Sequence, residues 1–181
     1  SFFGGVWAPV IEALRGRFRV IANDQRGHGD SAKPEDGYSF ETFAHDLQAL
    51  IEALGLTGVL AAGHSSGGTT IALHAALYPG LVERMVIIEP ILVPREWVGR
   101  AALNPMAEQA RRRRAIWSSQ QEMFDAYRSR PPFNTWREDV LRLYIEEGTS
   151  PLDNGNVQLK CPPHIEARFY EAVGFDSWPY L

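Results

Sequence analysis

Apolar residues recur every three or four positions in several stretches of the chain, which is the spacing of an amphipathic helix. The clearest stretch predicts a helix over Ser39–Leu54. Ser39 can cap its first turn, and Gly55 follows its last turn as a stop. The segments Val6–Leu14 and Gly67–Tyr78 have the same character and predict two further helices.

Short apolar runs without alternation lie between these helices. They are Phe18–Ala22, Val59–Ala62 and Met85–Ile88, and a run of this kind is typical of a strand that is covered on both faces. The segment Asp24–Gly37 is rich in Gly, Pro, Asp and Ser, which predicts a loop. Helices and strands therefore alternate along this half, and the alternation predicts an α/β fold whose parallel sheet is flanked by helices on both faces.

The pattern changes after Pro94, where no further buried-strand run follows. Asn104 and Pro105 predict the capped start of a long helix that continues to about Arg128. The remaining predicted elements are a helix over Arg137–Glu147, a hairpin turn at Asp153–Asn156 and a helix over Pro162–Val173. We therefore expect a core at residues 1–93 and a helical cap subdomain at residues 94–181.

Composition limits the classes of partner. The chain has 181 residues and a formal net charge of -4, so no dominant basic face favours a nucleic-acid partner. Cys161 is the single cysteine, which rules out a disulfide framework within the chain and predicts a reducing compartment, the cytoplasm. No apolar run approaches the roughly 20 residues that a membrane-spanning helix needs.

The candidate chemistry lies in the run Gly63-His64-Ser65-Ser66-Gly67, between a predicted strand and a predicted helix. A G-x-S-x-G turn of this kind holds its serine in an unfavourable backbone conformation, so that the hydroxyl stands at the carboxyl end of the sheet. We predict that Ser65 is a nucleophile and that the backbone N–H of Ser66 donates to the oxyanion of a tetrahedral intermediate. Gly63 and Gly67 are expected to be glycine because a Cβ at either position would collide. The alternative is a glycine turn with an incidental serine.

Three segments carry a family resemblance. Residues 23–31, NDQRGHGDS, resemble the D-x-R-G-x-G-x-S loop of α/β hydrolases, and Gly63–Gly68 is similar to their G-H-S-x-G-G elbow. Val82–Pro90 resembles the strand that follows the elbow helix in that family. The resemblance covers residues 1–93, and residues 94–181 resemble the variable helical cap of the family more loosely. It implies a partial α/β-hydrolase sheet with a cap.

The resemblance also narrows the chemistry. Family members that hydrolyse epoxides or haloalkanes carry Asp at the elbow, whereas this chain carries Ser65. Serine suits acyl transfer, which predicts hydrolysis of a small ester, a lactone or a related carbonyl compound, including a carbon–carbon bond beside a carbonyl. Neither a cofactor nor a metal is expected. The alternative is a non-catalytic receptor that binds a small molecule on the same scaffold.

Several parts of the expected machinery are not found in the chain. The family places its base, a His, and usually its acid, an Asp, later than Leu181, and its second oxyanion donor after a His-Gly pair that would precede Ser1. Glu89 is the alternative acid, since some members place the acid after the strand that ends here. We expect none of the histidines to be the base, although His164 keeps a possible role in a substrate pocket: His28, His45, His64, His74 and His164.

The family strand order places a further strand between Phe18–Ala22 and Val59–Ala62, which predicts a gap in the sheet. We therefore hypothesise that the chain is a fragment, truncated at both ends and nearly inactive alone. The run Arg111–Arg114 would point around a helix and is expected to be solvated. Cys161 is expected to act as a small buried hydrophobe. Cap aromatics are expected to form the cap core, some of them lining a pocket: Trp97, Trp117, Phe124, Phe133 and Trp136.

Overall fold

The computed structural model describes residues 2–98, 104–172 and 175–180. Contacts within the chain group it into two compact units. Unit 1 consists of residues 1–33 and 111–166, and unit 2 consists of residues 34–110 and 167–181. These units have other boundaries than the predicted core at 1–93 and cap at 94–181. The predicted boundaries follow the core and cap of the family, and they stay a prediction.

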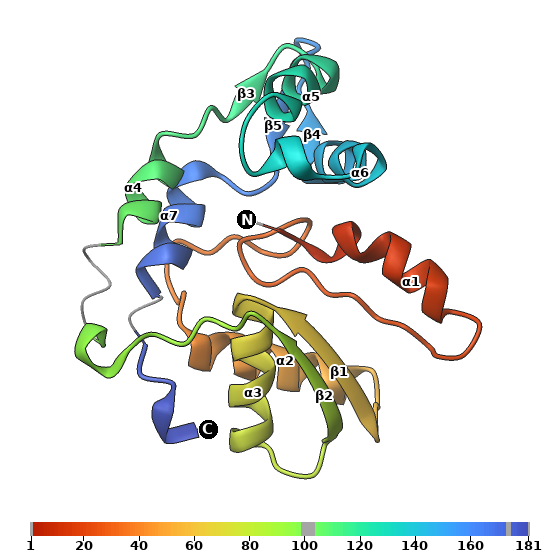
Figure 1. The fold of residues 1–181 in the computed structure, drawn as a ribbon, viewed down its shortest axis with the longest axis vertical. Coiled ribbons are helices and arrows are strands. Elements are labelled where there is room, and N and C mark those ends of the chain that lie inside the picture. The colour runs from red at the N-terminus through yellow and green to blue at the C-terminus, as the bar shows by residue number, and fades with distance from the viewer. Residues whose placement is uncertain (1, 99–103, 173–174, 181) are drawn as a thin grey trace. The chain divides into compact units, whose positions relative to one another are not determined.

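Unit 2 contains the predicted alternation of helices and strands (Figure 1). Its first four elements are α2 (Phe40–Ala53), β1 (Val59–His64), α3 (Ser66–Leu77) and β2 (Val82–Ile88). The strands β1 and β2 pair in parallel, and their register places Ala61 opposite Met85 and His64 opposite Ile88. The helix α3 packs on this pair, and α2 packs on α3. The predicted parallel α/β arrangement is confirmed for this segment.

The sequence signals for α2 act as expected. The Ser39 side chain caps the helix by accepting a hydrogen bond from the backbone N–H of Thr42 at 3.2 Å. The apolar stripe of α2 buries Phe40 and Phe43, which form a core cluster with Leu73 of α3. Burial of this stripe, more than helix propensity, holds the helix in place.

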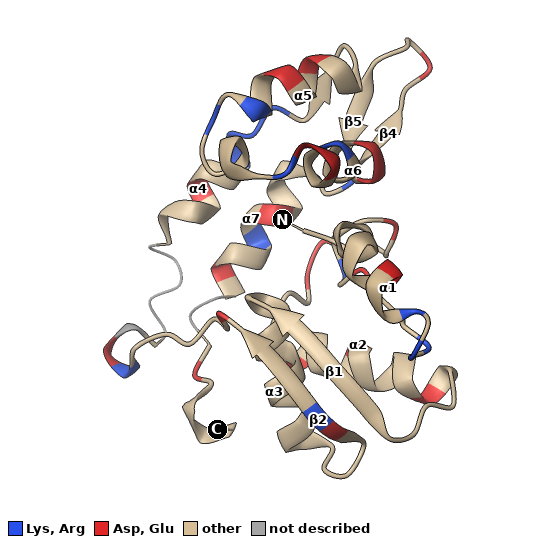
Figure 2. Ribbon diagram, turned by 45° about the vertical axis from the view of Figure 1, so that its right-hand side comes forward, with Lys and Arg blue, Asp and Glu red and all other residues tan. Residues whose placement is uncertain are grey.

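One face of the β1–β2 pair is exposed in the part of the chain that the structure describes. Leu60 is 52% exposed and Val86 is 60% exposed. Charge on the two strands is confined to Glu83 and Arg84 near the start of β2 (Figure 2). The burial on both faces that the apolar runs predict is therefore not found here, because α3 is the helix that packs directly on the pair.

The long helix predicted from Asn104 to Arg128 is wrong. The structure instead has α4 (Pro105–Arg111), the short strand β3 (Ile116–Trp117) and α5 (Gln120–Arg128). The predicted N-terminal cap of this helix is present, since Asn104 Oδ1 accepts a hydrogen bond from the Met106 N–H at 3.0 Å. The helix α4 ends after about two turns, and Ile116 and Trp117 further along the chain pair with another strand instead of continuing the helix.

Unit 1 has a three-stranded antiparallel sheet, of which the sequence predicted only the hairpin turn. Besides α1 (Ala8–Leu14), which follows a 3₁₀ turn at Gly4–Trp7, it contains α5 and α6 (Glu138–Gly148). Its sheet has the strand order β3-β5-β4, where β4 is Thr149–Pro151 and β5 is Val157–Leu159. The hairpin predicted around Asp153–Asn156 joins β4 and β5 and is confirmed, with Gly155 at a φ of 82°.

The strand predicted at Phe18–Ala22 is also wrong. The structure assigns no strand to these residues, and Phe18 and Ile21 are both more than 40% exposed. A strand needs a neighbour to pair with its backbone N–H and C=O groups. Among the described residues, β1 pairs with β2 alone, and the gap between Phe18–Ala22 and Val59–Ala62 stays a prediction.

The remaining described helices are α7 (Pro163–Glu171) and 3₁₀ turns at Arg95–Trp97, Phe133–Thr135 and Trp178–Tyr180. The predicted last helix is thus confirmed as far as Glu171, and Val173 lies outside the described residues. None of the helices that the structure describes is long and apolar enough to cross a bilayer.

An ion pair between a partly buried arginine and a buried glutamate lies within unit 1. Arg113 Nη1 pairs with Glu166 Oε2, and Arg113 Nη2 donates to the hydroxyls of Tyr127 and Tyr144 at 3.2 Å each. Glu166 is 2% exposed. Burial by itself would raise the pKa of the Glu166 carboxyl, but the positive charges of the chain's N-terminus and of Arg113 together hold that pKa well below its usual range.

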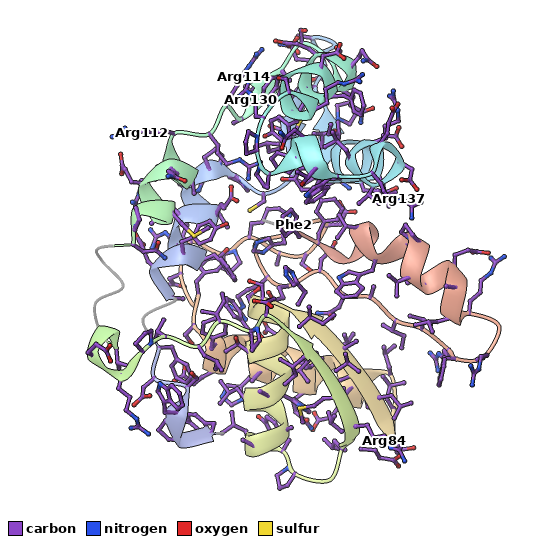
Figure 3. All side chains as sticks on the ribbon, viewed as in Figure 1. Phe2, Arg84, Arg112, Arg114, Arg130 and Arg137 are labelled. Atoms are coloured by element: carbon purple, nitrogen blue, oxygen red, sulfur yellow. The ribbon has the colours of Figure 1, made fainter. Side chains whose placement is uncertain are left out.

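The arginine run agrees with its prediction in part, because Arg111, Arg112 and Arg114 are exposed as predicted whereas Arg113 is partly buried. Arg111 ends α4, and Arg114, labelled in Figure 3, forms an ion pair with Glu122 at 2.6 Å and lies over the Trp117 ring. The run leaves the helix, so it does not circle a helical cylinder. Aromatic rings complete the core around the buried pair, as predicted for the cap aromatics: Trp117, Phe124, Phe133 and Trp136. The side chain of Trp97 lies outside the described residues.

We expect Glu166→Gln to lower the free energy of unfolding by about 3 kcal/mol, because it leaves the partly buried Arg113 charge without its buried carboxylate partner. The matched control is Glu138→Gln, which removes the partner of Arg142 from an exposed pair and should cost less than about 1 kcal/mol. Urea unfolding at neutral pH compares the two variants. Equal losses would show that the Arg113–Glu166 pair is no better shielded from water than the exposed pair.

Candidate active site

The strand β1 turns into the helix α3 through a single residue, Ser65. It has a φ of 54° and a ψ of -121°, and it occupies the N-cap position of α3. A positive φ in a residue with a Cβ costs on the order of 1–3 kcal/mol and persists only where neighbouring structure enforces it. The predicted strained turn at Ser65 is therefore present in the backbone, while its predicted role as nucleophile stays a prediction.

The glycines around this turn are not equivalent. A Cβ on Gly63 would lie 2.5 Å from the carbonyl carbon of Gly67, so the backbone of the new helix excludes any side chain there. A Cβ on Gly67 would meet nothing within 4 Å. The collision predicted at Gly67 is wrong, because it is the backbone of Gly67 that fills the space beside Gly63. The second tight position is Gly68, where a Cβ would lie 3.0 Å from Ile87 Cγ2.

The turn is also tied to the end of β2. The backbone N–H of Ser65 donates to the carbonyl of Ile88 at 2.9 Å, which continues the β1–β2 ladder by one bond. One turn into α3, the Thr69 hydroxyl accepts from the Ile91 N–H at 2.8 Å and donates to the Ile91 carbonyl at 3.0 Å. The chain leaving β2 is therefore bound to the elbow at two points, on either side of Glu89 and Pro90.

Glu89 is the second residue with an unusual backbone. Its φ is 45°, and Ser65 and Glu89 are the non-glycine residues with positive φ among those described. Pro90 follows, and a proline restricts the conformation of the residue before it. The side chain of Glu89 is exposed, and the described residues offer its carboxylate neither a hydrogen bond nor an ion pair. The carboxylate of Glu89 therefore lies at the carboxyl end of the parallel strands, which is where functional groups of such sheets are found.

The N-terminus of α3 suits an anion. The first N–H groups of a helix have no partner within it and carry partial positive charge. The helix runs for 12 residues and has no acidic residue in its first turn. The N–H of Ser66, the first helical residue, thus has the chemistry of an oxyanion donor.

The histidines of unit 2 lie in surroundings that differ from one another. His45 is exposed and bonds the Tyr78 hydroxyl at 2.6 Å, and His74 is fully buried with its Nε2 2.9 Å from Gln48 Oε1. Burial lowers the pKa of His74, which keeps its ring neutral. His64 is exposed at the end of β1. Within the described part of unit 2, no histidine hydrogen-bonds the Ser65 hydroxyl, and the expectation that none of the histidines is the base stays a prediction.

Unit 1 contains the other motif of the sequence analysis, the loop around Asp24. Asp24 accepts the backbone N–H groups of Gly4 at 2.7 Å and Asp30 at 2.8 Å. Gly29 has a φ of 48°, and a Cβ there would lie 1.9 Å from the Asp24 carboxylate. His28 is 3% exposed and its Nδ1–H donates to the Arg26 carbonyl at 3.1 Å. Burial lowers the His28 pKa to about 4, which supports the predicted structural role.

The single cysteine and possible metal ligands also bear on reactivity. Cys161 is partly buried, and burial raises the pKa of its thiol to about 11, so the thiolate that a nucleophile needs is scarce at neutral pH. Among residues 2–98, 104–172 and 175–180, no group of three or more His, Cys, Asp or Glu side chains is placed to hold a metal ion.

An apolar cavity of about 150 Å³ lies within unit 2. The buried hydroxyl of Ser177 lines it and has no hydrogen-bond partner in the described structure. The cavity walls come from α3, the end of β2 and the residues after it, and the C-terminal segment: Thr69, Ala72, Leu73, Ile87, Pro90, Leu92, Ser177 and Tyr180.

The sequence analysis missed Thr69. A threonine four residues after a predicted nucleophile could have been singled out, since Thr hydroxyls in helices commonly bond the carbonyl four residues earlier. The Thr69 hydroxyl does lie 3.4 Å from the Ser65 carbonyl. Its shorter bonds are to Ile91, which is 22 residues away in sequence and follows a different element, so its tie to the chain beyond β2 could not be anticipated.

Comparison with known proteins places these features in context. Residues 2–148 match the sequence profile of a family described as alpha/beta hydrolase fold. The chain is 32% identical over 155 residues to 2-(acetamidomethylene)succinate hydrolase of Mesorhizobium japonicum, which covers 83% of this chain and 52% of that protein. It is 39% identical over 93 residues to a bifunctional esterase/perhydrolase of Acinetobacter calcoaceticus, covering 49% of this chain and 34% of that protein.

A solved structure agrees with the sequence comparison. The crystal structure of E-2-(acetamidomethylene)succinate hydrolase superposes with a TM-score of 0.85 at 29% identity, over 98% of this chain and 64% of that chain. The chain spans about half the length, or less, of the two curated relatives described above.

The difference between the two elbow glycines gives a direct test. Gly63→Ala should destabilise the fold by about 3 kcal/mol, because its Cβ meets helix backbone that cannot move aside. Gly67→Ala is the matched control and should stabilise it, by up to about 1 kcal/mol, since alanine is the better helix former and finds open space. Urea unfolding separates the two. A larger loss for Gly67→Ala would contradict the described elbow.

Proposed function

The chain belongs to the α/β-hydrolase fold family, and from that premise we propose that the full-length protein is a serine hydrolase with Ser65 as its nucleophile. The relatives described above are named as a 2-(acetamidomethylene)succinate hydrolase and a bifunctional esterase/perhydrolase. The single observation that supports this role most is the backbone of Ser65, a serine held at a φ of 54° between the end of β1 and the start of α3. A residue that only linked the two elements would gain nothing from this strain.

The proposed reaction is acyl transfer. Ser65 Oγ attacks the carbonyl carbon of the substrate while a base takes its proton, and the carbonyl oxygen becomes an oxyanion. The Ser66 N–H at the start of α3 donates to that oxyanion. The leaving group departs with a proton from the same base, and water then releases the acyl group from Ser65. No cofactor takes part in this proposal.

The acid that orients the base is proposed at one of two places. The family usually supplies an Asp from a later segment, which would lie beyond Leu181. Glu89 is the alternative, supported by its position one residue after β2, by its positive φ and by its carboxylate, which has no partner among the described residues. Neither proposal gives this chain its own base, since the described histidines of unit 2 have other surroundings.

The substrate is proposed to be a small ester, a lactone or a related carbonyl compound. Serine at the elbow favours carbonyl chemistry, and the relatives named as a succinate-derivative hydrolase and as an esterase are compatible with it. The single cysteine has a thiol whose pKa is raised by burial, and a reducing compartment, the cytoplasm, stays the proposed location.

We expect a fluorophosphonate probe to label Ser65 in the full-length protein and to leave Ser65→Ala unlabelled. Ser66→Ala is the matched control and should still be labelled, because the backbone N–H that we assign to the oxyanion hole remains. Intact-mass and peptide mass spectrometry identify the labelled residue. If the folded wild type is not labelled, the proposed activity is wrong and a non-catalytic, ligand-binding role is favoured.

Glu89 separates stability from activity. Glu89→Gly should raise the free energy of unfolding by about 1 kcal/mol, because glycine adopts a positive φ without strain. Glu89→Gln keeps the shape, and if Glu89 is the acid it should lower kcat/KM by roughly 10²-fold or more. Urea unfolding and steady-state esterase assays measure the two effects. A Glu89→Gln enzyme with full activity would assign the acid to a later residue.

The control for the glycine effect is Glu83→Gly, which lies inside β2. Glycine weakens the interior of a strand, so this variant should lose stability. Loss of stability in both variants would show that the backbone at Glu89 is not strained.

A further inference from the structure

The turn between Glu89 and Ile91 is held by α3 rather than by the chain around it. After the Ser65–Ile88 bond, the bonds that the described structure gives to the backbone of this turn come from the Thr69 hydroxyl. That hydroxyl reaches both polar groups of Ile91, the N–H at 2.8 Å and the carbonyl at 3.0 Å. Thr69 is 2% exposed, so water cannot readily replace it.

Glu89 therefore lies between two fixed points that both belong to the elbow. On one side, the Ser65 N–H holds the carbonyl of Ile88, and on the other side Thr69 holds Ile91. A residue at a φ of 45° relaxes unless both of its flanks are restrained. Pro90 adds stiffness but donates no hydrogen bond of its own, so Thr69 is the side chain that completes the restraint.

We propose that Thr69 is a positioning residue, which fixes Glu89 beside the elbow so that its carboxylate can orient the base that serves Ser65. This inference rests on the proposed function and deepens it by choosing Glu89 as the acid. The Thr69 hydroxyl bonds backbone groups of Ser65 and Ile91 and not the Ser65 hydroxyl. It acts through the backbone of Ile91, and the carboxylate of Glu89 stays free of other partners in the described structure.

The test uses Thr69→Val, which keeps the β-branched shape and removes the hydroxyl, and Thr69→Ser, which keeps the hydroxyl. In the full-length protein, Thr69→Val should lose hydrogen-exchange protection at the Ile91 amide, and Thr69→Ser should retain it. Exchange is followed on fragments that cover residues 86–93 at single-amide resolution. This readout is independent of turnover. Unchanged protection in Thr69→Val would overturn the inference.

The second readout is the pH profile of kcat/KM. A carboxylate beside a base raises the pKa of that base, so misplacing Glu89 lowers it and moves the acidic limb of the profile to lower pH. Thr69→Val should show this shift together with a roughly tenfold or larger loss of kcat/KM, and Thr69→Ser should restore both. The double variant Thr69→Val/Glu89→Gln should lose no more than Glu89→Gln alone, since the two residues act in one unit.

The outcomes separate the two claims. If wild-type Ser65 is labelled by fluorophosphonate but Thr69→Val loses stability with an unshifted profile, Thr69 is a packing residue and the inference is overturned while the proposed function stands. Additive losses in the double variant overturn it in the same way. If wild-type Ser65 is not labelled, the proposed function fails and the positioning role fails with it, whatever the exchange measurement shows about Ile91.

Discussion

The turn at Ser65 depends on a close approach of backbone to backbone. Gly63 must lack a Cβ because the first turn of α3 occupies that space, with the Gly67 carbonyl carbon 2.5 Å from where the Cβ would be. Because of this close approach, Ser65 alone connects β1 to α3. The change of chain direction occurs at Ser65, which has a positive φ. The ladder to β2 and the packing of α3 on both strands keep the turn from relaxing.

The same restraint extends to the exit of β2. Parallel strands end at the same edge, so a residue after β2 is brought next to the residue after β1. Ser65 and Glu89 both have positive φ, and the hydrogen bonds that bracket Glu89 come from the backbone of Ser65 and the side chain of Thr69. Local strain of this kind is found at functional sites, where rigid surroundings hold a group in place for chemistry.

Unit 1 solves a different physical problem, the burial of charge. Glu166 is withdrawn from water and Arg113 is partly so, and two tyrosine hydroxyls accept hydrogen bonds from the guanidinium. The pair is surrounded by stacked and edge-on aromatic rings, among them Tyr127, Phe133 and Tyr144. A buried ion pair specifies an arrangement more than it stabilises one, because desolvation offsets most of the Coulomb attraction.

The sequence by itself determined the features that depend on neighbouring residues. The cap at Ser39, the stripe of α2, the strands β1 and β2 and the elbow between Gly63 and Gly67 follow from spacing and turn chemistry, and all of them are present. The family resemblance drawn from residues 23–31 and 63–68 agrees with the matched profile. Strained turns and caps are local, so a short window contains their cause.

Only the tertiary structure decided what depends on distant partners. Phe18–Ala22 has the composition of a strand but no neighbour to pair with among the described residues, and the helix predicted through Arg113 breaks where Arg113 finds Glu166, 53 residues away. The glycine that excludes a side chain proved to be Gly63 and not Gly67, and Thr69 was found to hold Ile91. Strand pairing, charge burial and close approach each need two residues that are distant in sequence. A pattern along one segment shows only one of the two residues.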